Sequence, residues 1–173
     1  VTLVGVILAD VGLHIPDFRA GERGFQLLCQ VSGRAGRGPM PGEVIIQTYV
    51  PQHYAVLAGA SQDYKAFYQQ ELAFRRQHGN PPFNRLVHLV YTNTNLALCP
   101  REVERLGQAI RNRIATQGLV GYDVVGPAPA FPDRVRGHHR WHIVLRGPAP
   151  RELLEGLELR RGWSVDIDPV SVL

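Results

Sequence analysis

The sequence is poor in cysteine. Its 173 residues include only Cys29 and Cys99, which lie far apart and in no Cys-x-x-Cys spacing. Structural zinc normally takes four closely placed Cys or His ligands, so we expect no zinc site built from this chain. Seven histidines are present, but His138, His139 and His142 lie among arginines, whose charge opposes cation binding. We therefore predict no metal site from these residues.

Long apolar runs are also missing. No stretch of about 18 uncharged apolar residues occurs, and Val1 opens a strand-like segment with no basic leader before it. These features predict a soluble, cytoplasmic protein with no membrane partner. The apolar content of 45% is ordinary for a globular core and argues against global disorder.

Lysine is nearly absent, so the net charge of +4 comes almost wholly from arginine. Lys65 is the one lysine among 19 basic residues. Arginine makes bidentate contacts with phosphate and stacks on bases, whereas lysine acts as a point charge. The composition therefore fits a nucleic-acid partner, although so modest an excess of positive charge is compatible with other classes of protein.

A glycine-spaced arginine pair is the most distinctive motif of the chain. Residues 30–37 read QVSGRAGR, follow an apolar helical run and precede a strand-like segment. Glycines let the backbone approach a ligand, and two arginines three positions apart form a guanidinium clamp suited to phosphate oxygens. When such a clamp reaches the terminal phosphate of a nucleotide, it acts as an arginine finger. The alternative is a solvated loop that closes a helix.

The first half of the sequence predicts alternating strands and helices. Residues 1–8 form a continuous apolar run, as expected for a parallel strand covered on both faces. Asp10 follows at the carboxyl end of this strand, where ligand groups cluster in open α/β sheets. Asp17 is placed to cap a helix over residues 19–31, and the β-branched residues of 43–49 predict a second strand.

The second half predicts a small α+β domain. A helix over residues 63–78 is stopped by the glycine and prolines of residues 79–82, and we place the domain boundary there. A long connection rich in proline and arginine is expected between the two middle strands, and the whole order is the split βαβ, ferredoxin-like pattern. The expected elements are a strand over 85–92, a helix over 100–116, strands over 122–125 and 140–146, a helix over 150–161 and a strand over 164–168.

Several segments, in order along nearly the whole chain, resemble one known family. Gln30, Gly33, Arg34, Gly36 and Arg37 match motif VI (QxxGRxGR) of superfamily 2 helicases. Residues 9–28 resemble the run that leads into this motif in replication-restart helicases of the primosomal protein N-prime (PriA) family. Residues 67–83, 126–141 and 166–169 resemble that family's FxxxELxxR…YPPF, GPAPA…RGxxRW and DVDP segments. Leu8 and Asn80 stand where the family usually has aspartate and tyrosine.

The resemblance implies an α/β fold in three parts. Residues 1–58 would form the C-terminal portion of a RecA-like helicase lobe, residues 59–82 a connector helix, and residues 83–173 a small α+β domain that binds DNA or partners. The complete protein would couple ATP hydrolysis to 3′–5′ DNA unwinding at stalled forks and would assemble the primosome. It would work in the cytoplasm, in association with the nucleoid.

The resemblance also implies a nucleotide site shared with another lobe. Arg34 and Arg37 would be the catalytic contacts to the terminal phosphates of ATP with Mg²⁺, and Gln30, Gly33 and Asp10 would assist in binding. Because the chain has no GxxxxGK[ST] phosphate loop and no DExH-type acid, we expect it not to hydrolyse ATP alone. The zinc of the family would be bound by cysteines upstream of these residues.

Two further segments are candidates for binding DNA or protein, and the first is the basic segment of residues 131–141. Its arginines can neutralise phosphates while an aromatic face stacks on an unpaired base, a combination that suits forked or single-stranded DNA. The alternative is a solvated loop with its tryptophan in the core. Arg151, near Arg160 and Arg161, could receive an acidic peptide such as the tail of single-stranded DNA-binding protein. The DNA candidates are Arg134, Arg136, His138, His139, Arg140 and Trp141.

Other readings remain open at this point. Asp166 and Asp168 lie on one face of a strand, where paired carboxylates could do catalysis or bind magnesium, but a solvated or salt-bridged face is the simpler interpretation. A family member without motor activity would be a protein that binds forks and recruits partners. An unrelated ribosomal-type RNA binder would explain the basic segment near the C-terminus but not residues 30–37.

Overall fold

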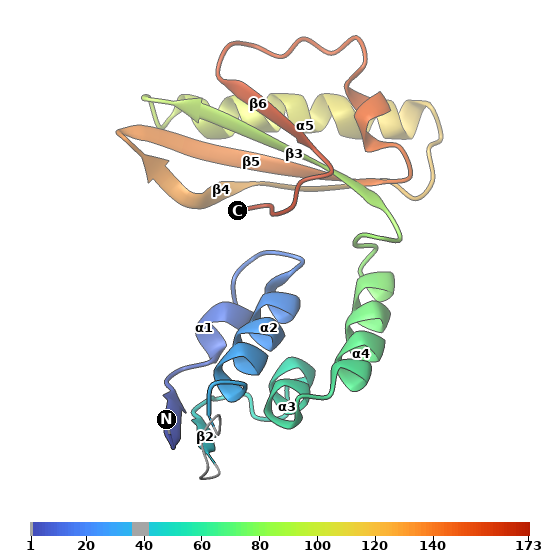
Figure 1. Cartoon of the computed structure of the whole chain (residues 1–173). Helices are drawn as coiled ribbons and strands as arrows, with labels where there is room; N and C mark the ends of the chain where they lie inside the picture. Colours follow the sequence, from blue (N-terminus) through green and yellow to red (C-terminus); the bar gives the residue numbers. More distant parts are fainter. Residues whose placement is uncertain (1, 36–41) are drawn as a thin grey trace. The chain divides into compact units, whose positions relative to one another are not determined.

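The computed structural model describes residues 2–35 and 42–173 and divides the chain into two compact units, residues 1–77 and 78–173 (Figure 1). Each unit combines helices with a β-sheet and has its own hydrophobic core, as the mixed α/β prediction requires. The helix that we expected as a separate connector belongs to the first unit, because its Phe67 packs in that core.

In residues 2–35 and 42–77, the first unit contains a two-stranded parallel sheet and four helices. The strands pair in register from Leu3 opposite Glu43 to Val6 opposite Ile46. Parallel strands need a crossover connection, and the first two helices supply it. The elements are β1 (Leu3–Val6), α1 (Asp10–Leu13), α2 (Ala20–Ser32), β2 (Glu43–Ile46), α3 (Tyr54–Ser61) and α4 (Tyr64–Gln77).

Helix α2 forms because its apolar residues recur at helical spacing, and it packs against α3 and α4. Phe25 of α2 stacks on Phe67 of α4, with ring centroids 4.1 Å apart. Helices α2 and α3 approach closely at Gly59, where a Cβ atom would lie 2.8 Å from the side chain of Leu28. Asp17, the expected cap of α2, does not bond to the first turn of this helix in the way we predicted. Its carboxylate accepts a 2.7 Å hydrogen bond from the N–H of Arg19, the residue just before the helix begins.

Strand β1 is less covered than the sequence predicted. Leu3 on β1 and Ile45 on β2 are each 55% exposed, while Val4 and Val6 on the other face are half-buried. Helix α2 packs beside β1, but no second layer covers the opposite face within the described residues. The expectation of a strand buried on both faces is therefore not met in this part of the chain.

The second unit is a four-stranded antiparallel sheet with one long helix. The strand order is β4-β5-β3-β6, so the first and third strands of the unit are central. This arrangement follows the expected split βαβ order of elements. The elements are β3 (Arg85–Asn93), α5 (Leu98–Thr116), β4 (Asp123–Val135), β5 (His138–Gly147), the 3₁₀ helix η1 (Pro150–Leu154) and β6 (Trp163–Ile167).

The core of the second unit lies between α5 and one face of the sheet. Val103, Leu106 and Ile110 of α5 are fully buried, as their spacing along one stripe of the helix predicts. They pack with Leu89 of β3 and Ile143 of β5, which alternate with residues on the opposite face.

The second helix of this unit is much shorter than predicted. We expected a helix over residues 150–161, but the structure has only η1, which ends at Leu154. The chain turns away at Gly156, where φ is +71°. Arg113 of α5 donates hydrogen bonds to the carbonyl oxygens of Leu153 and Glu155. In a continuing helix, these oxygens would accept from backbone N–H groups of the next turn.

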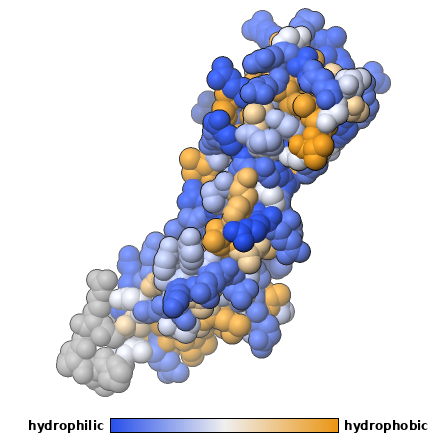
Figure 2. Space-filling model, turned by 90° about the vertical axis from the view of Figure 1, so that its right-hand side faces the viewer, coloured by the Kyte–Doolittle hydropathy of each residue, from blue (hydrophilic) through white to orange (hydrophobic). Residues whose placement is uncertain are grey.

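One face of the molecule is mainly polar. Figure 2 shows hydrophilic side chains over most of the face in view, with smaller hydrophobic patches between them. Among the described helices, none is both long enough and apolar enough to cross a lipid bilayer.

Candidate functional sites

The arginine motif begins at the C-terminal end of α2. Gln30 lies exposed in the last turn of this helix, and the N–H of Gly33 closes the helix by donating to the carbonyl oxygen of Cys29 at 2.9 Å. The N–H of Arg34 bonds the carbonyl oxygen of Val31 at 3.0 Å. Gly33 keeps helical dihedral angles, φ −68° and ψ −9°, so the conformational freedom of glycine is not used there.

Arg34 is exposed immediately after α2 and makes no ion pair within residues 2–35 and 42–173. The C-terminal end of a helix carries partial negative charge, which favours a cation there and disfavours a bare phosphate. Binding of an anion at this point would therefore depend on guanidinium groups, not on backbone N–H groups. Arg37, the second predicted catalytic residue, lies outside the described residues, as does Gly36.

Asp10 has a set of partners that the sequence did not reveal. It is 4% exposed, and its carboxylate accepts hydrogen bonds from the Thr48 hydroxyl at 2.8 Å and from the N–H of Tyr49 at 3.1 Å. Burial by itself would raise the pKa of Asp10, but these bonds to the ionised form outweigh it and lower the pKa. The carboxylate thus joins the end of β1 to the segment after β2.

The basic segment near the C-terminus is a β-hairpin, not the long connection that we expected. Strand β4 continues to Val135, and Arg136 and Gly137 form a two-residue turn with φ of 51° and 83°. Positive φ at both positions is typical of a type I′ turn. The prolines are accommodated because β4 is an edge strand and its pairing with β5 shifts register twice.

The hairpin separates the predicted DNA contacts into two groups. Arg134, Arg136 and His138 are exposed near the turn, and neither arginine forms an ion pair in the described part of the chain. His139 is half-buried, and Arg140 donates a 3.0 Å hydrogen bond to the carbonyl oxygen of Pro132.

Trp141 is half-buried and packs against the core with Tyr91, which lies opposite it in register. The alternative in which the tryptophan faces the core is thus the one the structure shows.

Arg151 is exposed on η1 and lines a cavity of about 390 Å³. Arg85 and Asp168 also line this cavity and form an ion pair, and the Arg85 guanidinium lowers the pKa of Asp168. Asp168 is therefore salt-bridged, while Asp166 is exposed beside His88 in register. Within the described ranges, no three His, Cys, Asp or Glu side chains are grouped to hold a metal ion.

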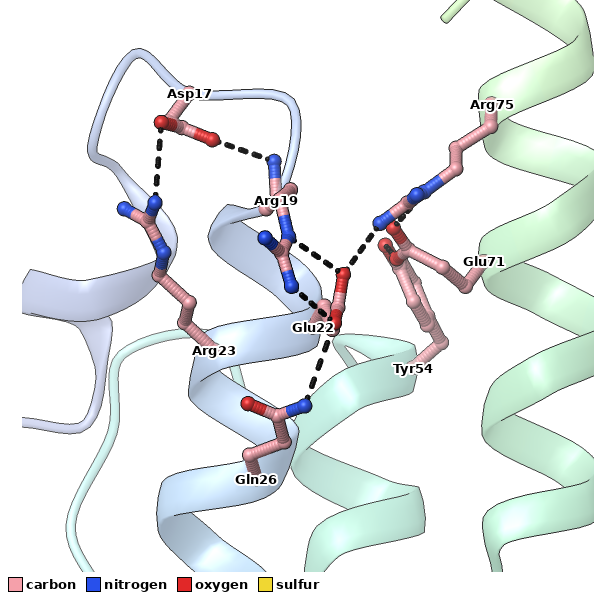
Figure 3. Close-up of polar contacts among 8 residues, drawn as sticks. All are labelled: Asp17, Arg19, Glu22, Arg23, Gln26, Tyr54, Glu71 and Arg75. Atoms are coloured by element: carbon pink, nitrogen blue, oxygen red, sulfur yellow. Dashed lines mark hydrogen bonds and ion pairs between the residues drawn. The ribbon is translucent and has the colours of Figure 1, made fainter. Parts of the chain in front are cut away.

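The first unit contains a polar network that the sequence did not predict (Figure 3). Glu22 of α2 accepts hydrogen bonds from Arg19 and from Arg75 of α4, each at 2.8 Å. Arg75 also donates to Glu71, which is only 6% exposed and accepts a second bond, of 2.6 Å, from the Tyr54 hydroxyl.

The pKa shifts follow from these contacts. Arg19, and after it Arg75, lowers the pKa of Glu22 to about 2 against the opposing effect of burial. Burial and the bond to Glu71 raise the pKa of Tyr54. The network links residues up to 53 positions apart, so no local sequence pattern could have shown it.

Comparison with known proteins identifies the family. Residues 76–170 match the family model described as the primosomal protein N C-terminal domain. The chain is 39% identical to the replication restart protein PriA of Synechocystis over 99% of its length, and 41% identical to that of Treponema pallidum over 99%. It is 40% identical over 84% of its length to the PriA of Bacillus subtilis. The chain spans 21%, 27% and 18% of these three relatives. It therefore belongs to the family of the primosomal protein N C-terminal domain, that of the PriA replication restart proteins.

Proposed function

We propose that this chain is the C-terminal part of an ATP-dependent 3′–5′ DNA helicase that restarts stalled replication forks. The observation that carries the motor part of this proposal is Arg34, an exposed guanidinium without an ionic partner among the described residues, placed directly after α2 inside a QxxGRxGR motif. The parallel pair β1 and β2, with helical crossover, supports the assignment of the first unit to part of a RecA-like lobe.

The proposed role of this motif is to stabilise the negative charge on the phosphoryl group that is transferred from ATP. ATP and Mg²⁺ would be held mainly by residues outside this chain, which has no phosphate loop of its own. Arg34 and Arg37 would bind the oxygens of the terminal phosphate, where negative charge spreads in the transition state. Gln30, one turn earlier on the exposed side of α2, and Gly33 would position the nucleotide beside them. The zinc of the family would be bound elsewhere in the protein.

The carboxylate of Asp10 takes part only indirectly in this proposal. Its oxygens are engaged by Thr48 and Tyr49, so it would hold the ends of the two strands together near the nucleotide.

The second unit would bind forked or single-stranded DNA through its hairpin. Arg134 and Arg136 project from the exposed end of β4 and its turn, where they can neutralise phosphates. His139 and Arg140 would support this surface, since Arg140 is bonded to Pro132. We further propose Arg151 as a contact for an acidic peptide of single-stranded DNA-binding protein or a primosome partner, with the complete protein acting in the cytoplasm near the nucleoid.

The experiment is ATP hydrolysis by the intact polypeptide that contains this chain. We expect Arg34→Ala and Arg37→Ala each to abolish hydrolysis stimulated by forked DNA, with fork affinity close to that of the wild type. Arg101→Ala, an exposed arginine on α5, is the matched control and should hydrolyse ATP normally. Hydrolysis retained in both motif variants would refute the assignment of the arginines.

A non-motor protein that binds forks and recruits partners is the second candidate. It requires only the second unit, which the family model matches over residues 76–170, and no role for the arginine motif. An intact polypeptide that binds forks but shows no DNA-stimulated ATP turnover would establish this candidate in place of the first.

A further inference from the structure

The hairpin of the second unit contains a pronounced irregularity in strand β4. Pro129 lies opposite Trp141, and Arg134 lies opposite His139. Residues 130–133 therefore face Arg140 alone, so the edge strand bulges at this point. Such bulges re-aim side chains away from the regular alternation of a strand.

The bulge is anchored on both sides of Phe131. Ala130, which precedes it, is 3% exposed and is held in the protein interior. Pro132, which follows it, accepts the 3.0 Å hydrogen bond from the Arg140 guanidinium. Between these anchors the Phe131 side chain is 59% exposed. An aromatic ring is thus presented to solvent from a fixed backbone position.

The charged residues of the hairpin segment that contains Phe131 are predominantly positive. Arg134 and Arg136 follow it on the same exposed arm, and Asp133 is the one acidic residue of the hairpin between Pro129 and Trp141. A base that stacks on the ring would therefore have its phosphates within the field of two arginines. Sequence reasoning selected Trp141 for stacking, but that side chain packs against the core.

We propose that Phe131 is a stacking platform for an unpaired base of single-stranded nucleic acid. This inference rests on the proposed binding of DNA by the hairpin. It adds Phe131 as a contact and a preference for unpaired bases. Every base has an aromatic face, so the contact tolerates any sequence but requires a base that is not stacked in a duplex. The hairpin would therefore prefer the single-stranded part of a branched substrate.

Equilibrium binding by the intact polypeptide tests this proposal, with a single-stranded oligonucleotide carrying 2-aminopurine and a blunt duplex as probes at several salt concentrations. Phe131→Ala should weaken binding of the single strand about 5- to 100-fold, leave its salt slope unchanged and leave duplex binding unchanged. Phe131→Trp should retain binding and the quenching of 2-aminopurine. Val120→Ala, which truncates an 89% exposed apolar side chain in the same unit, is the matched control.

Arginine variants keep the two proposals separate. Arg134→Ala and Arg136→Ala should each reduce the salt slope by about 1 if they contact phosphates. A slope unchanged in both would refute DNA binding by the hairpin. A reduced slope combined with normal affinity and quenching in Phe131→Ala would refute only the stacking role. Equal losses for single strand and duplex in Phe131→Ala would also overturn it, because stacking on an unpaired base predicts a difference between them.

Discussion

Tyr54 donates a 2.6 Å hydrogen bond to the carboxylate of Glu71, and this bond joins α3 to α4 inside the first unit. The Glu71 carboxylate also accepts from Arg75, which reaches on to Glu22 of α2. Three helices are therefore connected through two carboxylates. Because Glu71 is almost fully buried, each of its bonds compensates for the loss of water around a charged group.

Removing the tyrosine hydroxyl should destabilise this part of the chain. We expect Tyr54→Phe to lower the free energy of unfolding by about 1–3 kcal/mol, since a buried carboxylate loses a hydrogen-bond donor. The measurement is hydrogen exchange of the α3 and α4 amides, which reports on the first unit separately. Tyr68→Phe, which changes an exposed tyrosine of α4, should leave exchange unchanged, and equal protection in both variants would contradict the prediction.

The Glu22 carboxylate should make the first unit acid-sensitive. Its pKa is about 2 in the folded chain and 4.5 ordinarily, so the stabilisation is fully present above pH 4.5 and is lost as the pH falls toward 2. Glu22→Gln should be less stable than the wild type at pH 7, and the difference should shrink as the pH falls through this window. Thermal unfolding as a function of pH measures this, and a difference independent of pH would exclude the carboxylate as its cause.

At Gly21, helix propensity and packing predict opposite effects of an alanine substitution on stability. Alanine is favoured over glycine by about 1 kcal/mol in a helix interior. At position 21, however, a Cβ atom would lie 2.6 Å from the Tyr54 hydroxyl and 2.9 Å from a Glu71 carboxylate oxygen.

We therefore expect Gly21→Ala to destabilise the chain by about 1–3 kcal/mol through overpacking. Gly12→Ala, where the added Cβ would meet no atom within 4 Å beyond its chain neighbours and the backbone of its own helix, should be neutral or slightly stabilising. Urea unfolding of the two variants side by side compares them, and a stabilised Gly21→Ala would show that the contact relaxes without cost.

Asp10 should be a determinant of stability at the strand ends. Asp10→Ala leaves the Thr48 hydroxyl and the Tyr49 N–H without their acceptor and should therefore lower the free energy of unfolding. Thr48→Val removes one of these donors, so the double variant should be less destabilised than the sum of the single variants. A double-mutant cycle on urea unfolding measures this coupling, and strict additivity would show that the two side chains do not interact.

Periodic apolar patterns predicted several elements well. Helix α2 was expected over residues 19–31 and spans Ala20–Ser32, and α5 was expected over 100–116 and spans Leu98–Thr116. Both carry a regular apolar stripe that only a helix can bury on one side. The central strands β3 and β5 were also predicted; residues 86–91 of β3 are buried in succession, whereas burial alternates along the second half of β5.

The hairpin and η1 were not predicted correctly, for different physical reasons. Prolines in residues 127–132 favoured a loop, but an edge strand with register shifts needs fewer backbone donors than a central one. Residues 150–161 suggested a helix, but Arg113 satisfies the carbonyl groups at which η1 ends. The candidate nucleotide site was predictable only as the motif of residues 30–37. The contacts of Asp10 and Glu22 were not predictable, since their partners come from distant segments.

The irregular pairing of β4 has a consequence for self-association. A regular edge strand offers a row of free backbone groups on which the strand of another molecule can add, and such edges are sites of aggregation. In β4, three prolines without N–H groups and the bulge at residues 130–133 interrupt that row. The outer edge of β4 can thus remain open to solvent without becoming a template for sheet extension between molecules.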